Sequence, residues 1–191
     1  MKTESLYSVA SLIREDSNLG NMLECMREKL RNNKISFDEP KLGDHISWIP
    51  PFFASEDFAE GFAKGLRFCK LFENGVSVAT VRTKECRYLD RDRRACAIVL
   101  EPSEIMREVV EDLRVSITPE RWKYPPDRFT LLMHATAAVT PKEQPSFYEK
   151  IMELPPKERP DGEVSSISLH IPTIFLNRKD PSTGNWSPVH F

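Results

Sequence analysis

The chain has 191 residues, of which 40% are hydrophobic and 29% charged, and its formal net charge is −2. This composition can bury an apolar core, which excludes an intrinsically disordered chain. The near-neutral charge excludes a global positive field that would draw the protein to nucleic acid or membranes, so an anionic ligand must be met by a local cluster of donors. The length predicts a single domain over residues 1–191.

Targeting and cysteine signals are weak. The first residues, MKTESLYSVASLIRED, hold no apolar run of signal-peptide length, and no segment approaches the length of a membrane span. The four cysteines form no CxxC pair, which favours reduced thiols over disulfides or a zinc finger. We therefore expect a monomeric cytoplasmic protein with no membrane partner.

The first half of the chain alternates between strand-like and helical patterns. Asp16 or Ser17 can cap the first helix, and Ser55 can cap the second. A second strand starts at the sequence DHISWIP and is expected to stop at Pro50-Pro51, and a charged turn covers residues 90–93. In chain order, the pattern predicts strand, helix, strand, helix, strand and strand over residues 5–13, 17–33, 44–51, 55–69, 75–81 and 94–100.

The second half repeats this order. Ser103 can cap a helix, a loop rich in proline and aromatic residues follows, and a short helix ends at Pro155-Pro156. The pattern predicts strands over residues 129–139 and 163–177, and the tail 184–191 is expected to pair with the latter as an antiparallel strand. We therefore expect an α+β, two-lobed and pseudo-duplicated fold, with two mainly antiparallel sheets flanking a central cleft and helices on the outer faces.

Each half carries a histidine and a hydroxyl residue two positions apart on one strand, His45 with Ser47 and His134 with Thr136. Residues i and i+2 of a strand point to the same side, so each pair shares a face. Imidazoles can move protons near neutral pH, and hydroxyls can donate to phosphoryl oxygens. This set suits metal-independent phosphodiester chemistry, and the motifs leave open which imidazole is the base and which the acid.

The two motifs, HISW at 45–48 and HATA at 134–137, resemble the His-x-Ser/Thr-x motifs of the 2H phosphoesterase superfamily, which includes 2′-5′ RNA ligase-like proteins and cyclic phosphodiesterases. The resemblance implies a bilobal fold and a hydrolase that acts on 2′,3′-cyclic phosphate or 2′-5′-linked nucleotides or RNA ends in RNA processing. It implies His45 and His134 as catalytic residues, Ser47 and Thr136 as phosphate-binding residues, and no cofactor.

Five further residues are candidates for lining the cleft: His170, Arg82, Lys84, Trp122 and Tyr124. His170 is either a cleft residue or a structural or surface histidine. Arg82 and Lys84 share a strand face and could supply positive charge. Trp122 and Tyr124 could stack on bases or act as a hydrophobic plug that anchors a long loop.

Two other functions compete with the enzyme. The same cleft could belong to a non-catalytic module that binds RNA or a nucleotide, although the modest basic content argues against tight binding of RNA by charge alone. His45, His134 and His170 could together hold a metal ion. The sequence has no HExxH motif and no second carboxylate cluster at ligand spacing, so no metal is expected.

Overall fold

The computed structural model describes residues 4–15, 17–67, 72–73, 76–77, 80–89, 91–123, 133–162, 164–170 and 174–189. Eight strands form one antiparallel sheet in the order β10-β9-β1-β2-β7-β6-β5-β8, and β3 and β4 pair separately. The strands are β1 Ser5–Leu12, β2 His45–Ala54, β3 Phe72–Glu73, β4 Val76–Ser77, β5 Thr80–Leu89, β6 Ala95–Pro102, β7 His134–Val139, β8 Ser168–His170, β9 Phe175–Lys179 and β10 Trp186–Pro188. The α-helices are α1 Asn18–Asn32, α2 Glu56–Arg67, α3 Glu104–Val115 and α4 Tyr148–Met152, and the 3₁₀ turns are η1 Pro119–Arg121 and η3 Pro156–Glu158.

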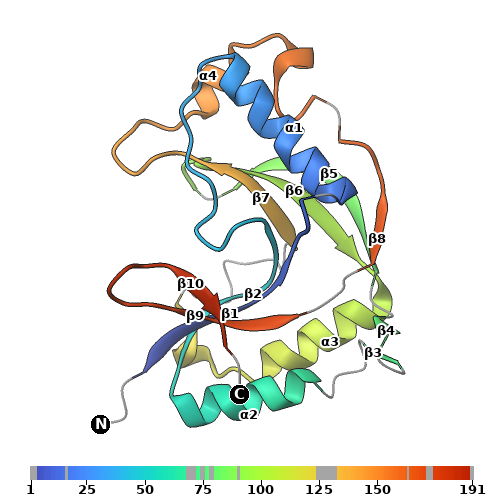
Figure 1. Ribbon diagram of the computed structural model, residues 1–191, viewed down its shortest axis with the longest axis vertical. Helices are drawn as coiled ribbons and strands as arrows, with labels where there is room; N and C mark the ends of the chain where they lie inside the picture. The colour runs from blue at the N-terminus through green and yellow to red at the C-terminus, as the bar shows by residue number, and fades with distance from the viewer. Residues whose placement is uncertain are drawn as a thin grey trace.

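The α+β class is as expected, but the prediction of two sheets is wrong. The two halves join into one sheet at the β2–β7 seam, which consists of the pairs Ile46–Ala135 and Ser47–His134. Among the described residues this seam is short: it has two pairs, whereas β1 and β2 are joined by seven. Figure 1 shows α1 and α4 beside one half of the molecule and α2 and α3 beside the other. The sequence reveals strands, but the pairing of strands far apart in the chain depends on tertiary contacts.

Helix α1 follows its sequence signals. Ser17 is its N-cap, and the Ser17 hydroxyl accepts a hydrogen bond from the Gly20 amide at 3.0 Å. The stripe of Leu19, Leu23, Met26 and Leu30 is buried, and the helix contacts β7. Burial of each Leu or Met side chain on this stripe contributes roughly 1.5–3 kcal/mol. The helix is therefore held on the sheet by its packing, directly behind the strand that carries His134.

Strand β2 does not stop at its prolines but continues through Pro50 and Pro51 to Ala54. The pairing with β1 explains this difference, because the register shifts between the Tyr7–Phe52 and Val9–Ile49 pairs. The prolines fall within that irregularity, where no ladder amide is required of them. Helix α2 begins after Ser55, whose hydroxyl accepts from the Phe58 amide at 3.4 Å. Helix α2 contacts β9, and α3 contacts β2.

The strand expected over residues 163–177 is in fact two strands. Strand β8 pairs with β5 at one edge of the sheet, and β9 pairs with β1 near the opposite edge. Residues 171–173 between them lie outside the described part, as do residues 124–132 before β7. Strand β10 pairs with β9 in antiparallel fashion, as predicted for the tail.

Two exclusions apply to the described residues. None of the helices there is long and apolar enough to cross a membrane. Cys25, Cys86 and Cys96 are free thiols, and Cys69 lies outside the described residues.

Candidate active site

The pairing of β2 with β7 brings Ser47 and His134 together on one face of the sheet. Paired residues of an antiparallel ladder point to the same side, with Cβ atoms about 4.5–5.5 Å apart. Ser47 is the direct partner of His134. Partners on the neighbouring strands extend this into a row across the sheet, which runs Phe175, Ala10, Ser47, His134, Val99 and Glu85.

A second row on the same face contains the other two motif residues. Leu12 is the partner of His45. Thr136 is the partner of Ala97, and Ala97 is the partner of Arg87. Continuing the β2–β7 register by one residue brings His45 to the level of Thr136. The two histidines are therefore diagonal neighbours across the seam, a relationship in which residues are about 7–8 Å apart.

Burial alternates along both motifs. His45, Ser47, His134 and Thr136 are half-buried, whereas the residues between and after them are buried. Ile46 and Ala135 are paired with each other and are 4% and 0% exposed. The apolar residues therefore face the core, and the four polar side chains lie together on the opposite, partly solvent-accessible face.

The ring of His45 has a defined orientation. Its Nδ1 lies 2.8 Å from the carbonyl oxygen of Gly43, and a carbonyl can only accept, so Nδ1 carries the proton and donates it. In the neutral ring, Nε2 then bears the lone pair. Burial lowers the pKa of His45, and the Gly43 hydrogen bond and the charge of Asp44 oppose that shift only in part. His45 is therefore biased toward the neutral form, with Nε2 as a proton acceptor.

An ion pair between Arg27 and Asp44, the residue before His45, lies next to this site. Arg27 of α1 is only 4% exposed, and its Nη1 donates to Asp44 Oδ2 at 3.0 Å while Nη2 donates to Asp44 Oδ1. Its Nε donates to the carbonyl oxygen of Ala137 at 2.9 Å. Burial disfavours the charge of Arg27, but hydrogen bonding to Asp44 and the charge of that carboxylate outweigh it, so the pKa of Arg27 is raised.

The other ionisable candidates lie farther along the sheet. Arg82 and Lys84 are exposed residues of β5, two strands from β7 and thus roughly 10 Å away. His170 is exposed on β8, three strands from β7 and roughly 14 Å away. That separation is incompatible with a metal site shared by His45, His134 and His170. Among the described residues, no group of three or more His, Cys, Asp or Glu side chains is arranged to hold a metal ion.

Trp122 packs as an anchor for its loop. It forms an isolated bridge with Phe52, and the two rings are 6.3 Å apart at an angle of 65°. Phe52 is fully buried in the core, and the Lys123 amide donates to the Pro51 carbonyl at 3.0 Å. These contacts favour the plug interpretation over stacking on a base. Tyr124 lies outside the described residues.

Sequence reasoning missed Arg27, Asp44 and Arg87. Arg27 lies four residues after Leu23, within the apolar stripe of α1, and a charged residue in such a stripe signals a buried cation that needs a carboxylate. Asp44 directly precedes the first motif. Arg87 had no local signal, because its position opposite Ala97, two strands from Thr136, depends on the β5–β6–β7 register.

Comparison with known proteins identifies the fold. No protein-family model and no curated protein sequence matches the chain. A crystal structure of a phosphoesterase is 13% identical with a TM-score of 0.50, and the match covers 98% of this chain and 97% of that one. E. coli LigT complexed with NADP+ is 12% identical with a TM-score of 0.50, over 97% of this chain and 95% of that one. Kluyveromyces marxianus Usb1 with uridine monophosphate is 15% identical with a TM-score of 0.48, over 97% and 99%.

These similarities extend over nearly the whole chain, although few residues are shared. The matches to the phosphoesterase and to LigT therefore show that this chain shares the fold of those two proteins.

Proposed function

We propose that the protein is a metal-independent phosphodiesterase that hydrolyses 2′,3′-cyclic phosphates or 2′-5′-linked nucleotides or RNA ends by two-histidine acid–base catalysis. The observation that carries the proposal is the register of the β2–β7 seam, in which Ser47 is the partner of His134 and His45 shares their face. A separation of about 7–8 Å between diagonal neighbours leaves room for a phosphoryl group between two imidazole rings.

The orientation of His45 supports its role as the general base. Its Nε2 takes a proton from the attacking water, whose oxygen forms a bond to phosphorus. His134, as the imidazolium, gives a proton to the ribose oxygen as the bond from phosphorus to that oxygen breaks. The product is a phosphomonoester and a free hydroxyl, and proton exchange with water restores both rings.

The hydroxyls of Ser47 and Thr136 stabilise the transition state in this scheme. Each donates a hydrogen bond to a non-bridging phosphoryl oxygen, where negative charge accumulates. Arg87 lies on the same face, one strand beyond Ala97, where its guanidinium forms an ion pair with Glu85 at 2.6 Å. All proton transfers and charge stabilisation are thus assigned to side chains of the chain itself.

A nucleotide substrate is consistent with the similarity to LigT, whose structure contains NADP+. NADP+ carries a phosphate on a ribose 2′ oxygen, which is one of the two oxygens esterified in a 2′,3′-cyclic phosphate. We therefore propose a ribonucleotide phosphate as the substrate class.

The test is hydrolysis of the four 2′,3′-cyclic nucleoside monophosphates and a 2′-5′-linked dinucleotide in the presence of EDTA. His45→Ala and His134→Ala should each lower kcat on the order of 10²–10⁴-fold. His170→Ala is the matched control, because His170 is exposed on β8, and it should retain wild-type activity. Wild-type turnover that persists in both motif variants would overturn the proposal. Salt-dependent binding of these compounds without turnover would instead identify a non-catalytic nucleotide-binding module.

A further inference from the structure

Arg27 contacts both motif segments through one buried guanidinium. On one side it binds the carboxylate of Asp44, the residue before His45, through Nη1 and Nη2. On the other side it donates from Nε to the carbonyl oxygen of Ala137, the residue after Thr136. We call this set of contacts the Arg27 bridge. It joins two residues, Asp44 and Ala137, that are 93 positions apart in the chain.

The β7 strand needs a donor at this point. Val139 exchanges backbone hydrogen bonds with Asp38, with the Val139 amide donating at 2.9 Å and its carbonyl accepting at 2.8 Å. The β6–β7 register shifts between the Thr136–Ala97 and Ala138–Cys96 pairs, so Ala137 is the extra residue of a β-bulge, and its carbonyl accepts the Arg27 Nε hydrogen bond. Strand β2 begins only at His45 and is paired with Ala135 and His134. The Arg27 Nε therefore satisfies a carbonyl in the gap between two paired stretches.

The segment before His45 depends on the same bridge. Gly43 adopts a left-handed conformation with φ +77, and its carbonyl oxygen accepts the proton of His45 Nδ1. Asp44 lies between these two residues, and its carbonyl accepts from the Ile13 amide at 2.9 Å. Fixing the Asp44 carboxylate consequently fixes the residues on both sides of it, including the acceptor that orients the His45 ring.

We propose that Arg27 is a positioning residue that holds His45 and Thr136 in the geometry required for the reaction. The inference rests on the proposed function. Among the described residues the β2–β7 seam has two residue pairs, so contacts outside the ladder contribute to the relative placement of the two motifs. The planar guanidinium adds three directed hydrogen bonds across that junction, which an ammonium group cannot reproduce.

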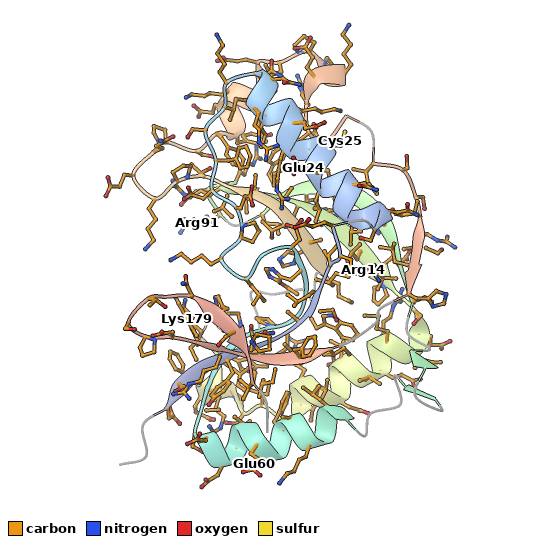
Figure 2. All side chains as sticks on the ribbon, viewed as in Figure 1. Arg14, Glu24, Cys25, Glu60, Arg91 and Lys179 are labelled. Atoms are coloured by element: carbon orange, nitrogen blue, oxygen red, sulfur yellow. The ribbon has the colours of Figure 1, made fainter. Side chains whose placement is uncertain are left out.

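The chain offers a matched control on the same helix. Arg31 is also on α1 and shares an ionic partner with Arg27, since Arg31 Nη1 binds Glu24 Oε1 at 2.5 Å and Arg27 Nη1 lies 3.5 Å from Glu24 Oε2. Glu24 is labelled on α1 in Figure 2. The Arg31 side chain is 46% exposed, and its ionic partners are Glu24 and Glu39. Arg31→Met therefore removes a charge from the helix without removing a contact to either motif.

The experiment compares Arg27→Lys, the double variant Arg27→Met/Asp44→Asn, and Arg31→Met. The double variant removes both partners of the buried pair, so it leaves no uncompensated buried charge and should fold. A displacement of reacting groups by about 1 Å can cost on the order of 10²-fold in rate. We expect the double variant to lose on the order of 10²-fold in kcat and Arg27→Lys roughly 10-fold, with KM within threefold of wild type. Arg31→Met should match wild type.

Two measurements distinguish positioning of His45 from a purely structural role of Arg27. One is a double-mutant cycle on kcat with His45→Ala, and the other is the tautomer of the His45 ring in the absence of substrate. If Arg27 acts through His45 as well as Thr136, the double variant should lower the residual kcat of His45→Ala by a smaller factor than it lowers the kcat of wild type, because the part of its effect that acts through His45 is already lost. Nitrogen chemical shifts of the His45 ring should report the Nδ1–H tautomer in wild type and its loss in the double variant. An equal kcat loss in both backgrounds, or an unchanged tautomer, would overturn the inference.

Failure of this inference and failure of the proposed function give different results. If His45→Ala and His134→Ala abolish turnover while Arg27→Lys and the double variant behave like Arg31→Met, the enzyme assignment stands and the positioning role of Arg27 is wrong. If the motif variants keep full activity, the proposed function is wrong, and the tautomer measurement alone then decides whether Arg27 orients His45.

Discussion

Ser47 and His134 are direct partners across the β2–β7 seam, although 86 residues, from 48 to 133, lie between them in the sequence. This pair and the adjacent Ile46–Ala135 pair join the two halves of the sheet, and the Ser47–His134 pair places a hydroxyl beside an imidazole on the half-exposed face. The proposed chemistry therefore depends on a tertiary contact at the centre of the sheet.

The two hydroxyls should matter for rate and little for stability. We expect Ser47→Ala and Thr136→Val each to lower kcat on the order of 10²-fold, because each removes a donor to the transition-state phosphoryl oxygens. Both residues are half-buried, so thermal midpoints should change little. Ser187→Ala on β10 is the control and should leave steady-state kinetics unchanged. Wild-type kcat in both motif variants would remove the hydroxyls from the mechanism.

The rate should depend on pH in a direction set by His45. Burial lowers the pKa of His45, so its base form persists below the ordinary histidine range near 6.5. The acidic limb of kcat/KM should therefore have its midpoint below pH ~6.5. A profile from pH 4.5 to 9 on a cyclic nucleotide measures it. A midpoint above the ordinary value would contradict the assignment of His45 as the base.

The same pKa shift predicts how stability changes with pH. Between the lowered folded-state pKa of His45 and its unfolded value near 6.5, the unfolded chain binds more protons. The free energy of unfolding gained from neutral His45 is thus complete above pH ~6.5 and is lost as the pH falls. His45→Asn should lose less stability than wild type between pH 8 and 5 in urea titrations. Parallel curves for wild type and His45→Asn would refute the prediction.

Alanine variants of two glycines with the same backbone conformation distinguish backbone strain from an effect on the orientation of His45. Gly43 and Gly184 both have positive φ, +77 and +73, where a Cβ is disfavoured. Alanine at either site should therefore cost about 1 kcal/mol of unfolding free energy. Only Gly43→Ala should also lower kcat, since the Gly43 carbonyl orients His45. Calorimetry and kinetics on both variants test this, and equal kcat losses would show that orientation by Gly43 is not required.

Trp122 is expected to affect stability rather than substrate binding. Its ring packs against Phe52, and the backbone of its loop bonds to Pro51. Trp122→Ala should lower the free energy of unfolding by about 2 kcal/mol through loss of buried apolar area. KM for cyclic nucleotides should stay within threefold of wild type. A large rise in KM without loss of stability would instead support stacking on a base.

The local elements were predictable because their causes are local. Apolar residues three and four apart indicated α1, and Ser17 at its start supplied the cap that the structure contains. The alternation in HISW and HATA correctly separated polar from buried side chains, since opposite faces of a strand follow from backbone geometry. The prediction of one strand over residues 163–177 was wrong because the two apolar stretches pair with different strands. Strand β8 pairs with β5, and β9 pairs with β1.

The sequence by itself determined the helices, most strands and the polar face of each motif, because periodicity and capping act over a few residues. Only the tertiary structure decided that β2 joins β7 in one sheet, and that Arg27 finds Asp44 and Ala137. Strand pairing and buried ion pairs link distant segments, and no local pattern specifies which partner a strand edge or a buried charge will meet.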